Sequence, residues 1–162
     1  MLKAIQTLMA GIEAGAIHCS EWQAWAEREI LQQPLPSSWL ADLITTSDPS
    51  EAQAALGEAW NRYRGNECSV DMTSLLVGFL YEQYVSGEAT LMRTLERIGY
   101  ELDGRNYGHL PCEAVFNLTN ELEAACGYEP MVAVVASKAK ALFDSHLDAA
   151  RQARQRLAGG PN

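Results

Sequence analysis

Residues 71–87, DMTSLLVGFLYEQYVSG, are the stretch that decides the fold. Asp71 is a good helix cap, and the pair Ser86-Gly87 interrupts the chain at the other end. Apolar side chains cover nearly the whole circumference between these points: Leu75, Leu76, Val77, Phe79, Leu80, Tyr81, Tyr84 and Val85. A helix that is apolar on every side is buried by neighbours on several sides. We therefore predict that this segment is the central helix of an all-α protein.

Two helices are predicted at the start of the chain. The apolar residues of 2–14 recur with helical spacing, and Gly15 ends that segment. The next helix begins at a capping-box pattern, with Ser20 as the N-cap and Gln23 as the third helical residue. Its apolar face is expected to carry Trp22, Trp25, Ala26 and Ile30, and the prolines that follow end it.

Two further helices precede the central one. Ser37 or Ser38 starts a short segment that turns Trp39 and Leu40 inward. The sequence Asp48-Pro49-Ser50-Glu51 then combines a cap, a proline suited to the first helical turn and an acidic residue at the positive helix end. This pattern predicts a helix that continues to Gly65.

The chain after the central helix predicts three more helices and one irregular stretch. A helix runs from Leu91 to Gly99, the irregular stretch covers Tyr100–Pro111, and a helix follows over Cys112–Cys126. The last of these is expected to bury Val115, Phe116, Thr119, Leu122 and Cys126.

The longest helix is predicted over Met131–Leu157. Its apolar seam is expected to consist of Val132, Val135, Ala139, Leu142, His146, Ala149, Ala153 and Leu157. The final turns, with Arg151, Arg154 and Arg156, are expected to project past the core or to fray. The whole pattern predicts a single-domain helical bundle of about seven to eight helices over residues 1–158, with a flexible tail at 159–162.

The patterns of hydropathy and cysteine point to a cytoplasmic protein. Residues 1–14 are spaced like an amphipathic helix and not like a signal peptide. The longest apolar run, Leu75–Tyr81, is far shorter than a membrane span. The four cysteines, Cys19, Cys68, Cys112 and Cys126, form no CxxC pair, so we expect free, buried thiols.

Charge is unevenly distributed along the 162 residues, whose net charge is −9. Residues 138–156 hold five basic and two acidic groups, whereas the rest of the chain holds 7 basic and 19 acidic groups. An acidic body repels nucleic acid and attracts a basic protein partner. The basic segment is expected to be solvated charge at a helix C-terminus, where it suits the helix dipole.

No motif for catalysis or for a cofactor is present. The sequence has no GxxxxGK[ST], GxGxxG, HExxH or GxSxG pattern. His109 and Cys112, with Glu113 beside them, have the spacing of one metal-ligand pair, but a structural zinc site needs two such pairs. We therefore expect no enzyme activity, no metal and no cofactor.

The irregular stretch is the best candidate for binding a partner. It concentrates aromatic and polar groups, and tyrosine and arginine are residues that anchor interfaces. The candidate partner-binding residues there and on the following helix are Tyr100, Asp103, Arg105, Tyr107, His109, Glu113 and Glu121.

The first third of the chain resembles a known class of protein. The segments GIEAGAIHCSEWQAWAEREI (residues 11–30) and PLPSSWLADLI (residues 34–44) resemble the opening of small helical immunity proteins of bacterial toxin–immunity systems. The shared order is a helix, a short link, a helix with the pattern W-A-x-x-x-I and a third helix led by proline. The resemblance implies tight binding of a toxin domain in the producing cell, and it carries over no catalytic residue.

Three hypotheses of function follow. The first is a cytoplasmic protein-binding module, an immunity protein that neutralises a basic toxin domain through an acidic surface. The second is a structural or regulatory protein that forms a homodimer through its long C-terminal helix, where Leu142 and His146 would lie in the interface. The third is a small enzyme or ligand carrier with its pocket near residues 100–113.

Overall fold

The computed structural model describes residues 1–63, 71–103 and 112–159. These ranges contain eight helices and no strand, which confirms the predicted all-α bundle. The helices are α1 (Leu2–Ala14), α2 (Cys19–Gln32), α3 (Ser38–Thr45), α4 (Pro49–Tyr63), α5 (Met72–Val85), α6 (Leu91–Asp103), α7 (Cys112–Ala124) and α8 (Glu129–Leu157). No helix in the described ranges is long and apolar enough to cross a membrane.

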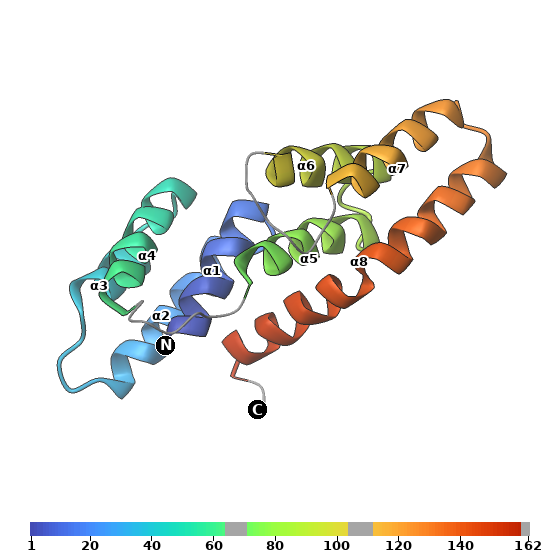
Figure 1. Ribbon diagram of the computed structural model, residues 1–162. Helices are drawn as coiled ribbons and strands as arrows, with labels where there is room; N and C mark the ends of the chain where they lie inside the picture. The colour runs from blue at the N-terminus through green and yellow to red at the C-terminus, as the bar shows by residue number, and fades with distance from the viewer. Residues whose placement is uncertain (64–70, 104–111, 160–162) are drawn as a thin grey trace.

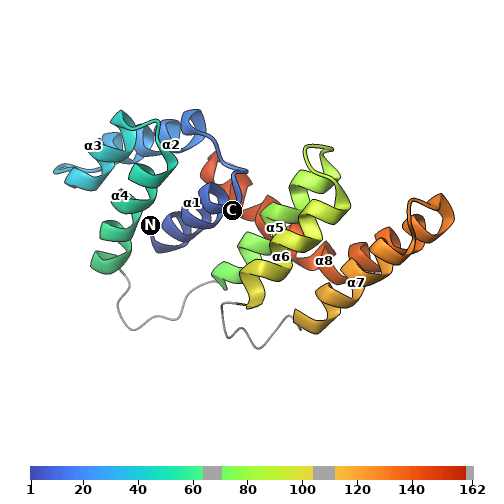
Figure 2. The same ribbon diagram turned by 90° about the horizontal axis from the view of Figure 1, so that it is seen from above.

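The helices are arranged as an elongated body around α5 (Figure 1). Helix α5 packs on α1, α6 and α8, and its most extensive contact is with α8. Helix α4 packs on α1, α3 packs on α4 and α2 packs on α3, while α7 pairs with α6 and with the N-terminal half of α8 (Figure 2). One cluster of buried apolar side chains draws on all eight helices. The prediction that residues 71–85 form the central helix is therefore confirmed.

The helix boundaries follow the predicted caps at most ends. Gly15 ends α1 in the left-handed conformation, with φ of 75°. The carboxylate of Asp48 accepts hydrogen bonds from the backbone amides of Ser50 and Glu51, and that of Asp71 accepts one from Thr73. The predicted helix end at Gly65 lies outside the described residues.

The predicted capping box of α2 is wrong by two residues. Helix α2 begins at Cys19 with His18 as its N-cap, and Glu21 is the third helical residue. The carboxylate Oε2 of Glu21 accepts a hydrogen bond of 3.1 Å from the backbone N–H of His18. An ionised carboxylate is a stronger acceptor than the amide oxygen of Gln23, so the helix starts where the glutamate can reach back.

Helix α6 continues for four residues beyond its predicted end at Gly99. Its buried stripe of Leu91, Leu95 and Ile98 is extended by Leu102, which is also buried. Gly99 is tolerated inside the helix because it lies against α7, where an added Cβ would be 3.4 Å from the ring of Phe116. Tyr100 and Asp103 therefore belong to a helix and not to an irregular stretch.

The buried faces of α7 and α8 differ from the predicted ones. On α7, Val115 and Leu118 are buried and Phe116 is exposed, and Cys126 lies beyond the end of the helix and is exposed. On α8 the seam after Ala139 runs through Phe143, Leu147 and Ala150, and Leu142, His146 and Ala149 flank it. The described cysteines are free, but Cys19 and Cys112 are only half-buried and Cys126 is exposed, so the prediction of buried thiols is wrong for Cys126.

The close approach of α5 and α8 depends on Gly78. An added Cβ at this position would lie 2.1 Å from the carbonyl oxygen of His146 and 2.8 Å from the Cβ of Ala150. Beside this contact, the hydroxyl Oγ of Ser74 and Nδ1 of His146 are 2.7 Å apart and share a hydrogen bond. Small residues on both helices thus let the two backbones meet.

We predict that Gly78→Ala destabilises the protein by about 3 kcal/mol, because the added methyl group must push the α8 backbone away. Gly57→Ala is the matched control, since nothing lies within 4 Å of an added Cβ on this α4 residue. The control should raise the free energy of unfolding by about 0.5–1 kcal/mol. Chemical denaturation measures both, and equal stability of the two variants would contradict the proposed contact.

We also predict that the free energy of unfolding decreases as the pH is lowered through the range in which His146 titrates. Burial lowers the pKa of His146 from its ordinary value of 6.5, although the charge of Asp71 acts in the opposite direction. The contribution of the neutral ring is therefore complete above pH 6.5 and is lost as the pH falls through the lowered pKa. Denaturation curves between about pH 7 and pH 5 should show this loss. The slope should be smaller in His146→Asn, and an unchanged slope would refute the assignment.

Candidate interaction surface

The structure places four of the seven predicted binding residues. Tyr100 and Asp103 lie on the last turn of α6, Glu113 lies on the first turn of α7, and Glu121 lies farther along α7. The other three, Arg105, Tyr107 and His109, lie outside the described residues. The candidate surface is therefore described on α6 and α7 alone.

The outer face of α6 combines an aromatic ring with acidic groups. Glu96, Tyr100 and Asp103 are spaced four and three residues apart, so they share one face of the helix, and all three are exposed. Tyr100 is the one large aromatic side chain of the three, and 80% of its surface is accessible. A tyrosine this exposed buries little of its apolar area within the chain and can bury it against a partner.

Helix α7 adds a second exposed ring beside the first. The sequence predicted Phe116 to be buried, but 45% of its surface is accessible. Its ring leans across α6 at Gly99, the residue next to Tyr100. Glu113 is exposed one helical turn before Phe116. We call the five residues Glu96, Tyr100, Asp103, Glu113 and Phe116 the α6–α7 face.

The sequence contained a signal for Phe116 that the prediction did not use. Val115 and Leu118 are three residues apart and suffice as the buried stripe of a helix whose main contacts, within the described residues, are with α6 and α8. Phe116 then falls outside the stripe. The predicted stripe included Phe116 because residues 115, 116, 119, 122 and 126 also have helical spacing.

Glu121 does not belong to the α6–α7 face. Its two carboxylate oxygens lie 2.8 and 2.6 Å from the Nζ of Lys138 on α8, so it links the two helices of the α7–α8 hairpin. Both side chains are about half exposed, and such a pair contributes little to stability. The prediction that Glu121 contacts a partner stays untested.

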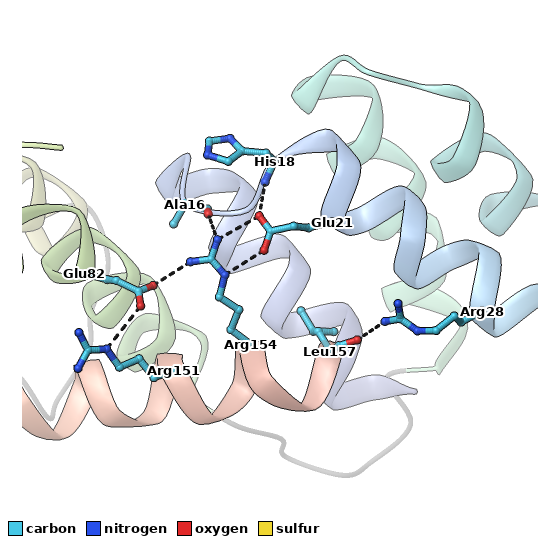
Figure 3. A network of polar contacts seen from close by, with 8 residues as sticks. All are labelled: Ala16, His18, Glu21, Arg28, Glu82, Arg151, Arg154 and Leu157. Carbon is cyan, nitrogen blue, oxygen red and sulfur yellow. Dashed lines mark hydrogen bonds and ion pairs between the residues drawn. The ribbon is translucent and has the colours of Figure 1, made fainter. Parts of the chain in front are cut away.

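A second polar centre joins α8 to α2 and α5 (Figure 3). Arg154 donates two parallel hydrogen bonds to Glu21, of 2.9 and 3.0 Å, and a third of 3.2 Å to Glu82 on α5. It also donates a hydrogen bond of 2.7 Å to the backbone carbonyl of Ala16, in the link between α1 and α2. Arg151 lies 3.5 Å from the other oxygen of Glu82. The expectation that these last turns project or fray is therefore wrong.

The link between α1 and α2 is held from a second side by Arg97. This α6 residue donates hydrogen bonds to the carbonyls of Ala14 and Glu13, of 3.0 and 2.5 Å, at the end of α1. Carbonyls at the last turn of a helix have no partner within the helix, so two arginines from distant parts of the chain satisfy this region.

The charges of this centre shift the pKa values of its members. Burial acts to raise the pKa of Glu21, but the hydrogen bonds from Arg154 and from the His18 backbone outweigh it and hold the pKa below the ordinary value of 4.5. The hydrogen bond to Glu21 raises the pKa of Arg154 despite burial. The ionised pair contributes stability above pH 4.5, which is lost as the pH falls through the lowered pKa of Glu21.

The described residues offer no metal centre. They contain no group of three or more histidine, cysteine, aspartate or glutamate side chains that could hold an ion. The predicted pair of His109 and Cys112 lies partly outside them, and burial raises the pKa of the Cys112 thiol, with the charge of Asp103 adding to the effect. A raised pKa lowers the fraction of the thiol that is present as the nucleophilic thiolate.

Comparison of the chain with protein-family models, with curated proteins and with solved structures yields no match.

We predict that Arg154 and Glu21 are energetically coupled. A double-mutant cycle with Arg154→Gln and Glu21→Gln should give a coupling free energy of about 1–2 kcal/mol, since the pair is bidentate but about one third exposed. The control cycle uses Glu58 and Arg62, an exposed pair one turn apart on α4, and should give about 0.5 kcal/mol or less. Equal coupling free energies in the two cycles would show that the interaction of Arg154 with Glu21 is no stronger than that of an exposed surface pair.

Proposed function

We propose that this chain is a protein-binding module that binds a basic protein through its α6–α7 face. The observation that carries the proposal is the exposure of Tyr100 between two acidic residues of the same helix face. Tyrosine is enriched among the residues that dominate binding energy, and it can bury apolar area while its hydroxyl stays hydrogen-bonded.

Charge supports a basic partner. Three of the five residues of the α6–α7 face are acidic, Arg93 is an exposed basic residue one helical turn before Glu96, and the chain as a whole has a net charge of −9. Complementary charge speeds the encounter of two proteins, and apolar contacts such as those of Tyr100 and Phe116 prolong the complex. In this proposal the three carboxylates speed association, and the two rings slow dissociation.

The finer proposal is an immunity protein that neutralises a basic toxin domain. It is supported by the resemblance of residues 11–44 to the opening of such proteins and by the acidic surface. The resembling segment forms the last turn of α1 together with α2 and α3, on one side of α5, while helices α6 and α7 lie on the other (Figure 2). The N-terminal helices would then serve as the scaffold, and the surface that distinguishes partners would lie on α6 and α7.

A homodimer is the second proposal, and one observation favours it. The N-terminal end of α8 exposes Tyr128, Met131 and Val134, and in the described part of the chain this end packs only on α7. The earlier expectation that Leu142 and His146 lie in the interface suits this less well, because both are half-buried within the chain. Sedimentation of the purified chain distinguishes a dimer from a monomer.

The test of the main proposal starts with affinity capture from the native host. We expect one basic protein in stoichiometric amount, and its binding to the purified chain is then measured by surface plasmon resonance. Tyr100→Ala should weaken binding by about 30-fold, as loss of an interface anchor does. Asp103→Lys should slow association most strongly at low salt. Glu58→Lys, an exposed change on α4, is the matched control.

Three results would contradict the proposal. One is repeated capture of the chain alone. Another is a captured partner whose affinity is unchanged by Tyr100→Ala. The third is an association rate that Asp103→Lys and Glu58→Lys lower equally, since that would show attraction by net charge without a defined face.

A further inference from the structure

A cleft of about 640 Å³ lies where α2 faces the C-terminal end of α8. The residues that line it come from α2, α5 and α8: Ser20, Glu21, Ala24, Arg28, Glu82, Arg151, Arg154, Gln155, Leu157 and Ala158. This volume falls in the range of about 300–1,000 Å³ that is usual for small-molecule sites. The cleft is remote in sequence from the α6–α7 face and shares no residue with it.

Within the described residues, long side chains join α2 to the C-terminal end of α8 at two points, and the cleft lies between them. At one point Arg154 reaches Glu21, and at the other Arg28 donates a hydrogen bond to the backbone carbonyl of Leu157 (Figure 3). Ala24 lies between Glu21 and Arg28 on the same face of α2, three residues from one and four from the other. Its methyl group and that of Ala158 are too short to fill the space between the two points.

The charges in the cleft leave one cation without an anionic partner. Glu21 is neutralised by Arg154, and Glu82 lies against both Arg154 and Arg151. Arg28 bonds only a neutral carbonyl, and within the described residues no carboxylate pairs with it. A guanidinium presents five N–H donors, so most of those of Arg28 stay available to a ligand.

The volume of the cleft and the guanidinium of Arg28 indicate which chemical class of ligand would fit. A bare inorganic anion would leave most of the volume empty, whereas Ala24, Leu157 and Ala158 offer an apolar wall. We propose that the cleft binds a monoanion with an apolar body, of the class of medium-chain carboxylates, with its carboxylate on Arg28 and its hydrocarbon chain along Ala24 and Ala158. Bidentate pairing of carboxylate with arginine is the geometry this site offers.

Isothermal titration calorimetry with decanoate tests the proposal. We expect binding at one site with a Kd of the order of 0.1–1 mM. Arg28→Gln should weaken it at least about tenfold, because it removes a charge-assisted hydrogen bond. Ala24→Leu keeps every charge but fills the cleft, and it should abolish binding. Arg62→Gln, on the exposed side of α4, should bind decanoate like the unaltered chain.

Decanol and inorganic phosphate separate the two parts of the ligand. Decanol should bind at least about tenfold more weakly than decanoate. Inorganic phosphate should not compete with decanoate for the cleft. The proposal is overturned by absence of decanoate binding, by equal affinity for decanol, by competition from phosphate, or by binding that survives Ala24→Leu. Circular dichroism of each variant verifies that it is folded, so a loss of binding reports on the cleft.

Discussion

The contact between α5 and α8 at Gly78 is the constraint on which the rest of the structure depends. The absence of a side chain there lets the α5 helix lie against the backbone of α8 at His146. Helix α5 also packs on α1 and α6. The position of α8 relative to α5 therefore determines where the two ends of α8 lie relative to the other helices. Its N-terminal half pairs with α7, and its C-terminal turns bring Arg154 to Glu21 and Glu82.

The Arg154 network and the helix core have different roles in this arrangement. Buried apolar contacts supply most of the stabilising free energy, and they tolerate many similar packings. The bidentate pair with Glu21 and the bond to the carbonyl of Ala16 are directional, so they define one position of α8 against the link between α1 and α2. Arg97 does the same from α6, through the carbonyls of Glu13 and Ala14. Three parts of the chain that are distant in sequence thus meet at this one link.

The sequence predicts the helices well because their signals are local. Asp48, Asp71 and Gly15 act within one helical turn, and the apolar residues of 75–85 report burial without reference to any partner. Apart from the N-cap of α2, where the nearby Glu21 decides, the errors discussed next arise where a distant residue decides. Gly99 would end a helix alone, but packing on Phe116 and the burial of Leu102 carry α6 to Asp103. In the sequence, Arg154 has the pattern of a solvated charge at the end of a helix. In the folded chain it pairs with Glu21 and Glu82, and no spacing in the sequence indicates that pairing.

The same reason explains how much of the candidate surface was predictable. Tyr100, Asp103 and Glu113 were selected by composition, and the structure places them at adjoining ends of two paired helices. Phe116 was predicted to be buried because it shares the helical spacing of the expected apolar stripe, whereas Val115 and Leu118 suffice for the packing of α7 on α6 and α8. An aromatic ring that the core does not need remains accessible beside carboxylates that no core could accept. Under the proposed function, a basic partner that covers both rings and pairs with the carboxylates would bury the exposed apolar area of Tyr100 and Phe116.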